Sequence, residues 1–467
     1  MPFKALLHRA SNSAFGNASD PLGAAAPNAY SAVMSQAPSP IRPTDAEAIA
    51  LAQHLLATAR FAALGVLDPD TGSPLVSRIA FGQDATATPL TLISDLSAHA
   101  RAIAVDAVAR YGRFNDSWMN GYSKEFSKEL GELGFIGMTW PKEFGGGGRP
   151  PIDRLIVGEE LIAAGAPIAA SWFGDRQMGP AFMAYGTPEQ QKAFLPGILS
   201  GEDTWCIGMS EPDAGSDLAS LKTSAVLDGD EWVINGQKIW TSFGAVAQYC
   251  YLICRTSNDG PPHAGISEIV VPMNTPGIEA REIQDMTTNR HFCEVFYTNV
   301  RVPKANLVGE QGGAFKQTMR QLEHERGGID RLVSNHALYL KARERADTSD
   351  PRVRQTIAQL EMYYRIGRIL VVREVLKQAP AGFSAATKCF CTEHEWRVGQ
   401  FVAETFGADA MLWGDDATEE NQWGHHLLSQ FAIRIGGGTD EIQHNIIAER
   451  GLGLPREPMP DKDQPWR

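Results

Sequence analysis

The segment from Gly208 to Ser242 carries the residue types that could bind a planar cofactor. Its first part, Glu211 to Asp217, is rich in turn-forming residues, and two alternating runs then flank the dipeptide Asn235-Gly236. Asn-Gly is a strong hairpin signal, so the sequence predicts a β-meander here. A meander would present backbone N–H groups, small hydroxyls and the indole of Trp240 on a rigid surface. A planar cofactor with polar edges could use that surface.

A second candidate for chemistry is a carboxylate on an expected helix. Leu322, Glu325 and Ile329 recur at i, i+3 and i+7, which places them on one helical face. Glu323 lies about 160° round the helix from Glu325. A carboxylate in an apolar stripe is costly unless it has a partner or a chemical role. Two interpretations stay open: Glu325 is catalytic, or it forms an ion pair with Arg326 or with another helix.

Length, composition and net charge limit the class of protein. The 467 residues suggest about three domains at roughly 150 residues each. With 43% hydrophobic and 21% charged residues, the composition is that of a soluble globular protein. No run of about 18 apolar residues occurs, so we expect no membrane span. The net charge of −13 disfavours nucleic-acid binding.

The cysteines and the N-terminus bear on localisation. Six cysteines show no CxxC spacing, so we expect reduced, buried thiols, no metal site and a cytoplasmic protein. Residues 1–43, rich in Ala, Ser, Pro and Asn, predict a disordered extension. Lys4, His8 and Arg9 give this extension a faint likeness to a transit peptide, which would place the protein in the mitochondrial matrix.

Residues 44–113 predict short strands rather than a complete domain. A helix capped by Thr44 precedes three expected strands, Phe61–Leu67, Leu75–Phe81 and Pro89–Ser94, with hairpin-length links. Their order resembles the first half of a flavin-binding split barrel of the pyridoxamine-phosphate-oxidase-like type. Three unclosed strands cannot enclose a cofactor, so we expect this segment to bind nothing, and a fusion artefact is the simpler explanation.

The rest of the chain divides into three segments by its periodicity. Residues 114–204 are mainly helical, 205–312 consist of strands, and in 313–467 the apolar spacing suits a helical bundle. Thr187-Pro188 is a cap-plus-proline helix start within the first segment. The predicted fold class is α+β: an N-terminal helical domain, a middle antiparallel β domain and a C-terminal helical bundle, preceded by the partial split barrel of residues 44–113.

Two blocks of the middle segment, MSEPDAGSD and INGQKIWTS, resemble the middle domain of the acyl-CoA dehydrogenase family. GFIGMTWPKEFGG and YGTPEQQKAFLPGILSG are similar to its N-terminal helical domain. The resemblance covers residues ~114–457 and implies a flavoprotein oxidoreductase with FAD and an acyl-CoA substrate. It also implies an electron-transferring flavoprotein as electron acceptor, a homo- or hetero-tetramer, and a place in lipid metabolism, in fatty acid or steroid degradation.

The resemblance also implies roles for individual residues. Those that it assigns to FAD are Met209, Ser210, Gly215, Ser216, Trp240, Ser242, Thr439 and Glu441. It assigns substrate binding to Ser216, near the thioester, and to Arg326, which would meet the CoA phosphate. The residues alone leave alternatives open, in which Trp240 belongs to the core of the sheet and the hydroxyls of Ser210 and Ser242 only line a hairpin edge.

The family reaction removes the proton α to an acyl-CoA thioester, while the β-hydrogen leaves as hydride to the flavin. Many members carry the catalytic carboxylate in a Tyr-Glu-Gly-Thr segment, but this chain has Gly437 at the Glu position. Other members place the carboxylate on the first long helix of the bundle, where Glu325 matches. The resemblance therefore implies that Glu325 is the catalytic base.

These observations lead to two functions. The first is an acyl-CoA dehydrogenase, an oxidoreductase acting on CH–CH bonds, with Glu325 as base and electrons passed to an electron-transferring flavoprotein. The alternative is a base-lacking or half-site subunit of a heteromeric acyl-CoA dehydrogenase. A third interpretation, a flavin- or heme-related binding module on residues 44–110, is disfavoured because that barrel is unfinished. The sequence does not identify the acyl chain.

Overall fold

The computed structural model describes residues 61–67, 74–80, 82–83, 89–90, 92–318, 328–413, 416–417 and 422–458. The predicted extension over 1–43, the predicted helix that begins at Thr44, and the two residues Glu325 and Arg326 lie outside these ranges. The chain forms two compact units, Met1–Ala62 with Gln83–Pro89, and Ala63–Gly82 with Leu90–Arg467. The sites discussed below all belong to the second unit.

The first described strands form two small sheets. β1 (Phe61–Leu67) pairs with β2 (Pro74–Ala80), and β3 (Gly82–Gln83) pairs with β4 (Pro89–Leu90). The first two predicted strands are therefore confirmed. The third is wrong beyond Leu90, because α4 (Leu92–Tyr111) begins there. A helix forms here instead of a strand because Ala100, Ala104 and Ala107 recur at helical spacing and are fully buried. The split-barrel resemblance stays a prediction.

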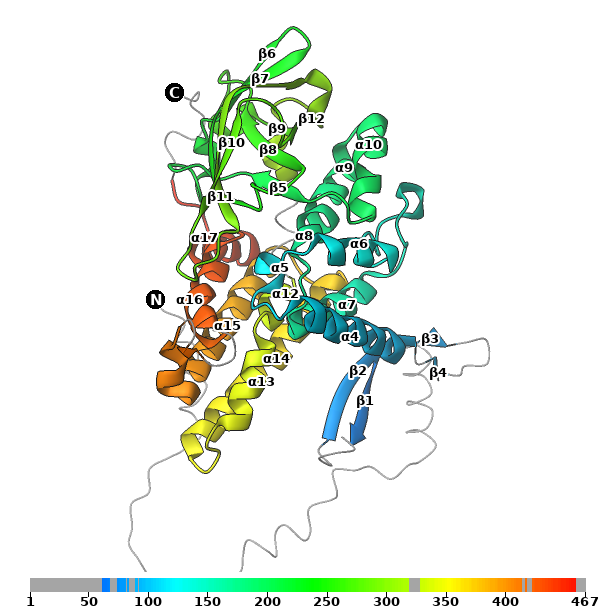
Figure 1. Cartoon of the computed structure of the whole chain (residues 1–467), viewed down its shortest axis with the longest axis vertical. Helices are drawn as coiled ribbons and strands as arrows, with labels where there is room; N and C mark the ends of the chain where they lie inside the picture. Colours follow the sequence, from blue (N-terminus) through cyan, green and yellow to red (C-terminus); the bar gives the residue numbers. More distant parts are fainter. Residues whose placement is uncertain are drawn as a thin grey trace, which may run out of the picture. The chain divides into compact units, whose positions relative to one another are not determined.

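Helices make up the part that precedes the large sheet (Figure 1). Helix α4 packs along α7, and its Arg101 forms an ion pair with Glu160 at 2.8 Å. The predicted helix start at Thr187 is confirmed, with a capping box formed by Thr187 and Gln190. The remaining elements here are α5 (Ser117–Asn120), α6 (Lys124–Glu132), η1 (Lys142–Phe144), α7 (Pro151–Ala164), α8 (Ala169–Phe173), the π-helical turn η2 (Gly174–Met178), α9 (Gly179–Tyr185) and α10 (Pro188–Leu199).

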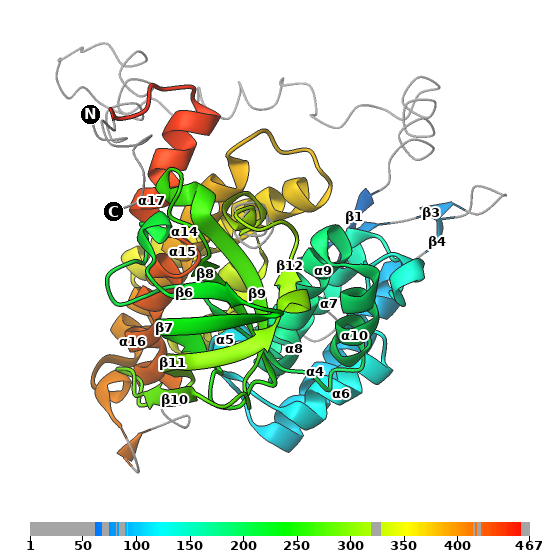
Figure 2. The same ribbon diagram turned by 90° about the horizontal axis from the view of Figure 1, so that it is seen from above.

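The middle domain is an eight-stranded sheet with the path β10-β11-β7-β6-β8-β9-β12, and β5 pairs with β8 (Figure 2). Most neighbours are antiparallel, as predicted, but β5 and β6 each run parallel to β8. The strands are β5 (Trp205–Gly208), β6 (Ser224–Asp228), β7 (Glu231–Ser242), β8 (Tyr249–Arg255), β9 (Ile266–Pro272), β10 (Ile278–Ile283), β11 (Phe292–Pro303) and β12 (Leu307–Val308).

The predicted hairpin at Asn235-Gly236 is wrong, because both residues lie inside the continuous strand β7. The dipeptide instead accompanies a bulge, at which the pairing with β11 shifts register between Tyr297 and Val300. The Asn235 side chain accepts from the Asn299 backbone N–H at 2.8 Å. Gly236 has φ +147°, and a Cβ there would lie 2.5 Å from the Thr223 Oγ1 atom. Glycine is therefore required here by close packing.

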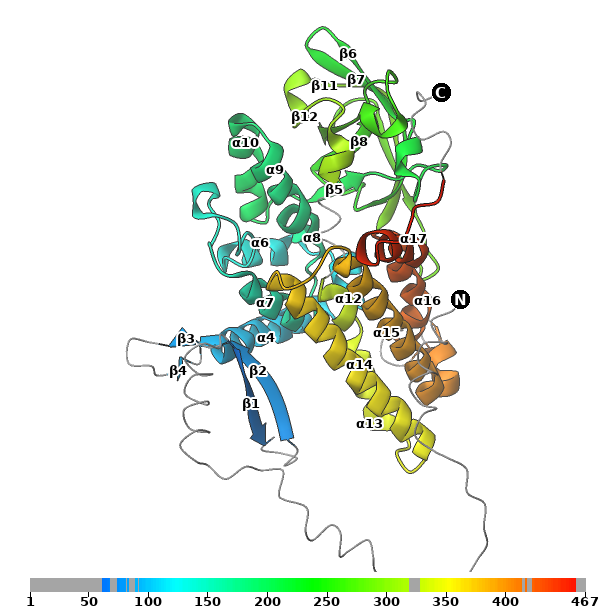
Figure 3. The same cartoon turned by 180° about the vertical axis from the view of Figure 1, so that it is seen from behind.

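The C-terminal part is a helical bundle, as predicted, in which α13, α14 and α15 lie side by side (Figure 3). One helix of the bundle, α16, was not foreseen in the sequence; it buries Trp423 and Ile433. The elements are α12 (Asp330–Val333), α13 (His336–Arg345), α14 (Pro351–Val375), α15 (Phe383–Phe406), η6 (Gly407–Met411), α16 (Gln422–Ile435), α17 (Asp440–Ile446) and η9 (Ile447–Gly451).

Replacing Gly236 by Ala should lower the free energy of unfolding by about 1–3 kcal/mol, because the new methyl group would overlap Thr223. Gly229→Ala is the matched control: Gly229 also has a positive φ, in the β6–β7 turn, but a Cβ there meets nothing within 4 Å. It should cost only about 1 kcal/mol. Urea denaturation of both variants measures the difference, and equal costs would contradict the packing argument.

Candidate functional site

Lys238 and Glu211 form a buried ion pair beneath the predicted cofactor surface. The Nζ atom of Lys238 lies 2.8 Å from the Glu211 Oε1 atom, and Lys238 is fully buried. Glu211 also accepts from the backbone N–H groups of Lys222 and Thr223, at 2.6 and 2.8 Å. Burial by itself raises the pKa of Glu211, but the charge of Lys238 and these hydrogen bonds outweigh it, so the pKa is lowered.

The same lysine fixes the segment that the sequence assigns to the flavin ring. Lys238 Nζ donates to the Met209 carbonyl at 2.9 Å, and the Ile239 N–H donates to the Ser210 carbonyl at 2.9 Å. Met209 and Ser210 are therefore held against β7, two strand positions from Trp240. The structure thus brings Met209 and Ser210 next to β7, although Lys238 follows Met209 by 29 positions in the sequence.

Trp240 is not a core residue of the sheet. Its side chain is 55% exposed, and its backbone has φ +59°. A tryptophan with positive φ is a backbone outlier that needs support from the surrounding structure. The support comes from the register shift in the β7–β11 pairing between Cys293 and Val295 and from an edge contact between Trp240 and Phe292, with ring centroids 5.7 Å apart. The exposed indole thus offers a flat apolar face to a ligand.

The predicted serines keep their hydroxyls available. The hydroxyls of Ser210, Ser216 and Ser242 make no hydrogen bond to any residue that the structure describes. Gly215 is exposed, and a Cβ there would meet nothing within 4 Å. Donors that no described residue uses, and open space at a glycine, suit the carbonyl and phosphate oxygens of a nucleotide cofactor.

Thr439 and Glu441 belong to a different part of the chain, the start of α17. The Thr439 side chain caps this helix by accepting from the Ile442 N–H at 3.3 Å. Glu441 is fully exposed, and hydrogen bonds from its own N–H and from Thr439 lower its pKa. Beneath them, the buried Lys388 binds Asp440 at 3.0 Å. Within the described part of the chain, no hydrogen bond or ion pair joins these two residues to the surface around Trp240, so their part in one site stays a prediction.

The predicted base Glu325 and the predicted phosphate ligand Arg326 fall between the described ranges, but the structure shows what holds both flanks. Thr318 and Gln317 donate to the buried Glu268, at 2.8 and 2.7 Å. On the other side, Ile329 is buried, as the predicted apolar face requires. The core therefore holds the chain as far as Thr318 and again from Ile329.

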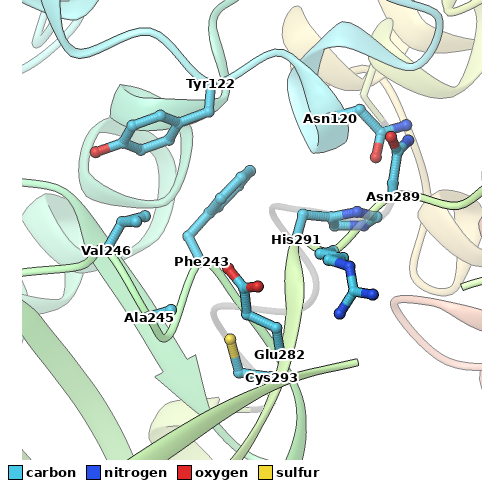
Figure 4. A pocket seen from close by; sticks show the side chains of 10 residues that line it. Asn120, Tyr122, Phe243, Ala245, Val246, Glu282, Asn289, His291 and Cys293 are labelled. Carbon is cyan, nitrogen blue, oxygen red and sulfur yellow. The ribbon is translucent and has the colours of Figure 1, made fainter. Parts of the chain in front are cut away.

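A cavity of about 240 Å³ lies beside Phe243, just after the end of β7, and nothing in the sequence pointed to it. Figure 4 shows Tyr122, from the N-terminal helices, opposite Phe243 and His291 from the β domain. Neither ring nitrogen of His291 has a hydrogen-bond partner, and burial lowers its pKa to about 4, so the ring is neutral at pH 7. The lining residues are Asn120, Tyr122, Phe243, Ala245, Val246, Glu282, Asn289, Arg290, His291 and Cys293.

Comparison with known proteins identifies the class to which this fold and surface belong. Residues 94–202, 206–300 and 312–452 match the N-terminal, middle and C-terminal domains of acyl-CoA dehydrogenases, in that order. The first match begins at residue 94, inside α4, so nearly all of this helix belongs to the matched N-terminal domain. The chain belongs to the acyl-CoA dehydrogenase family, whose members are FAD-dependent enzymes, and it has the helical, β and helical domains of that fold.

Individual relatives agree with this assignment. Acyl-CoA dehydrogenase IpdE1 of Mycobacterium tuberculosis is 37% identical over 346 residues, which are 72% of this chain and 88% of IpdE1. The solved structure of the Tcur3481-Tcur3483 steroid ACAD is 33% identical, with a TM-score of 0.72 over 78% of this chain and 98% of that chain. The ChsE4-ChsE5 complex from Mycobacterium tuberculosis is 30% identical, with a TM-score of 0.70 over 79% and 99%.

Two negative findings apply to the described residues alone. None of their helices is long and apolar enough to cross a membrane. Nor do three or more of their His, Cys, Asp or Glu side chains gather in a way that could hold a metal ion.

The substitution Lys238→Met should destabilise the protein by about 3–5 kcal/mol, because it leaves Glu211 charged and without its partner. Adding Glu211→Gln to Lys238→Met should recover part of that loss. Urea denaturation of both single variants and the double variant measures the coupling. Strictly additive losses would show that the two side chains do not stabilise the fold as a pair.

The contribution of Glu211 should also depend on pH. Its folded pKa is lower than that of an ordinary Glu, about 4.3, so the ionised carboxylate stabilises the fold above that pH. The contribution is lost as pH falls through the folded pKa. The difference in unfolding free energy between the wild type and Glu211→Gln should therefore shrink between pH 7 and pH 3.5, and a constant difference would be the contrary result.

Proposed function

We propose that this chain is a flavin-dependent dehydrogenase that introduces an α,β double bond into an acyl-CoA thioester. The observation that carries the proposal is Trp240, an exposed indole at a positive φ in a chain of this family. The hydroxyl of Ser242, two residues further along β7, makes no hydrogen bond to any described residue. Such a surface fits the flat ring and polar edge of FAD, which would accept the hydride from the β-carbon.

In this proposal, the residues of the chain position the cofactor and the substrate and provide a proton acceptor. Met209, Ser210 and Ser242 hold the edge of the flavin ring, Trp240 stacks beside it, and Gly215 with Ser216 approaches the pyrophosphate and the thioester. Glu325 takes the α-proton, and Arg326 meets the CoA phosphate. Thr439 and Glu441 contact the other half of the cofactor, and an electron-transferring flavoprotein takes the electrons.

A second candidate function is a half-site subunit of a heteromeric dehydrogenase. One observation favours it: Gly437, at the position where many family members carry their catalytic Glu, has φ +70°. The turn around it is held by Lys388, which donates to the carbonyls of Arg434 and Gly438 at 2.9 and 3.0 Å. A side chain at position 437 would be strained in this turn. The carboxylate then comes from Glu325 or from a partner chain.

The purified chain should be yellow, and its flavin should lose absorbance when a suitable acyl-CoA is added. Glu325→Gln should bind the flavin and the acyl-CoA but lose α-proton exchange by a factor of at least about 10³, because an amide cannot accept the proton. Absorbance spectra and deuterium exchange followed by mass spectrometry measure the three properties.

Glu323→Gln is the matched control, because residue 323 is predicted to face away from Glu325; it should leave exchange unchanged. Normal exchange in Glu325→Gln would exclude this residue as the base. A colourless chain that gains flavin and activity only with a related partner chain would support the half-site subunit instead.

A further inference from the structure

A polar cluster is buried where the N-terminal helices meet the chain just after Glu325. It consists of Arg176 on the η2 turn and of Asp330 and Arg331 on α12, and we call it the Arg176 cluster. Two tryptophans flank it: the Arg176 guanidinium lies 3.8 Å from the centroid of the Trp172 ring, and that of Arg331 lies 5.2 Å from Trp118. None of these residues belongs to the surface around Trp240.

The local backbone is built to aim Arg176 inward. Arg176 lies on a π-helical turn between α8 and α9, a type of insertion that is frequent at functional sites. The preceding residue, Asp175, fixes the turn by accepting from the Gly137 N–H at 2.7 Å. On α7, Gly158 leaves room for the guanidinium, because a Cβ there would lie 3.3 Å from the Arg176 Nη2 atom.

The guanidinium of Arg176 makes no hydrogen bond to any residue within the described ranges. Among the described residues it forms an ion pair with the Asp330 Oδ1 atom at 4.0 Å, which is too far for a hydrogen bond. That oxygen also lacks a hydrogen-bond partner, whereas Asp330 Oδ2 accepts from Arg331 at 2.9 Å. Arginine carries five N–H donors, and leaving them unused in a protein interior is costly.

Arg176 is the member of the cluster that a ligand could reach. The side chains of Asp330 and Arg331 are closed to solvent, whereas that of Arg176 is 19% exposed. Burial lowers the pKa of Arg176 to about 10, and the nearby Arg154 contributes in the same direction. The group nevertheless stays protonated at neutral pH. A small group that reaches Arg176 would therefore meet a positive charge whose N–H donors no described residue uses.

The cluster lies close to the proposed base. Asp330 follows Glu325 by five residues, a length of chain that spans at most about 18 Å even when fully extended. Ile329, expected on the same helical face as Glu325, lies beside Arg176, since both contact the space above Gly158. An acyl chain of moderate length that starts at the base could therefore reach Arg176.

We propose that Arg176 binds an oxygen acceptor at the end of the acyl group remote from the thioester. The inference rests on the proposed function and narrows its substrate class to acyl-CoA thioesters that carry a carboxylate or a carbonyl oxygen at that end. Both groups present the oxygen lone pairs that a guanidinium binds, and a carboxylate would in addition balance the charge of the cluster. Asp330 is a positioning residue that keeps Arg176 and Arg331 in place.

The test compares thioesters of equal length on the flavin-loaded protein. Hexanoyl-CoA is set against adipoyl-CoA and 5-oxohexanoyl-CoA, and octanoyl-CoA against suberoyl-CoA. We expect the wild type to favour at least one oxygenated thioester in kcat/KM, and Arg176→Met to lower that preference by about 10- to 100-fold through KM, with the plain thioesters unaffected. Arg176→Lys should restore part of it.

Dissociation constants from titration calorimetry should follow the same order, which separates binding from the chemical step. Arg352→Met, at the exposed start of α14, is the matched control and should change nothing. A preference for adipoyl-CoA over 5-oxohexanoyl-CoA assigns the acceptor as a carboxylate, and the reverse assigns it as a carbonyl.

The alternative is that Arg176 only completes a buried ion network. In that case Arg176→Met would lower Tm strongly and would reduce turnover of plain and oxygenated thioesters alike, and this result would overturn the inference. We expect Tm to change by less than about 2 °C, because no hydrogen bond is lost. A wild type that oxidises only plain thioesters would also overturn it, whereas a protein that reacts with no thioester would contradict the proposed function itself.

Discussion

The ion pair between Lys238 and Glu211 is the interaction on which the proposed flavin surface depends. Lys238 is fully buried and binds two groups of the segment that follows β5, the Glu211 carboxylate and the Met209 carbonyl. A buried charge needs several partners, so the pair can form only when β5, the turn after it and β7 are correctly assembled. The same assembly holds Ser210 against β7, where the Ile239 N–H donates to its carbonyl at 2.9 Å.

The sequence correctly predicted those elements whose conformation depends only on neighbouring residues. The cap at Thr187 and the alternation in β7 are properties of a few consecutive residues, and both are present in the structure. The hairpin prediction at Asn235-Gly236 was wrong because residues distant in the sequence determine the conformation of this dipeptide. Thr223 packs against the glycine, and the Asn299 N–H donates to the asparagine side chain. A dipeptide that usually forms a turn is here kept inside a strand by Asn299 of β11 and by Thr223, the residue before β6.

The parts of the site that the sequence did not reveal share a physical cause. The cavity at His291 and the Arg176 cluster each join residues from the N-terminal helices with residues from a later domain. The family blocks lie within single domains, and periodicity reports only which face of an element is apolar. What distinguishes His291 and Arg176 is that neither side chain has a hydrogen-bond partner among the described residues, and only the folded structure shows this.

The turn at Gly437 and Gly438 restricts which residue can occupy position 437. The two glycines have φ values of +70° and +91°, and Lys388 ties the turn to α15, so a longer side chain at position 437 would be strained. The proposed base Glu325 lies in the sequence between two segments that the core holds, one ending at Thr318, which donates to the buried Glu268, and one that contains the buried Ile329. A proton acceptor must hold its position relative to the bound substrate. The proposed function therefore assigns the proton acceptor to Glu325 and none to the glycine turn.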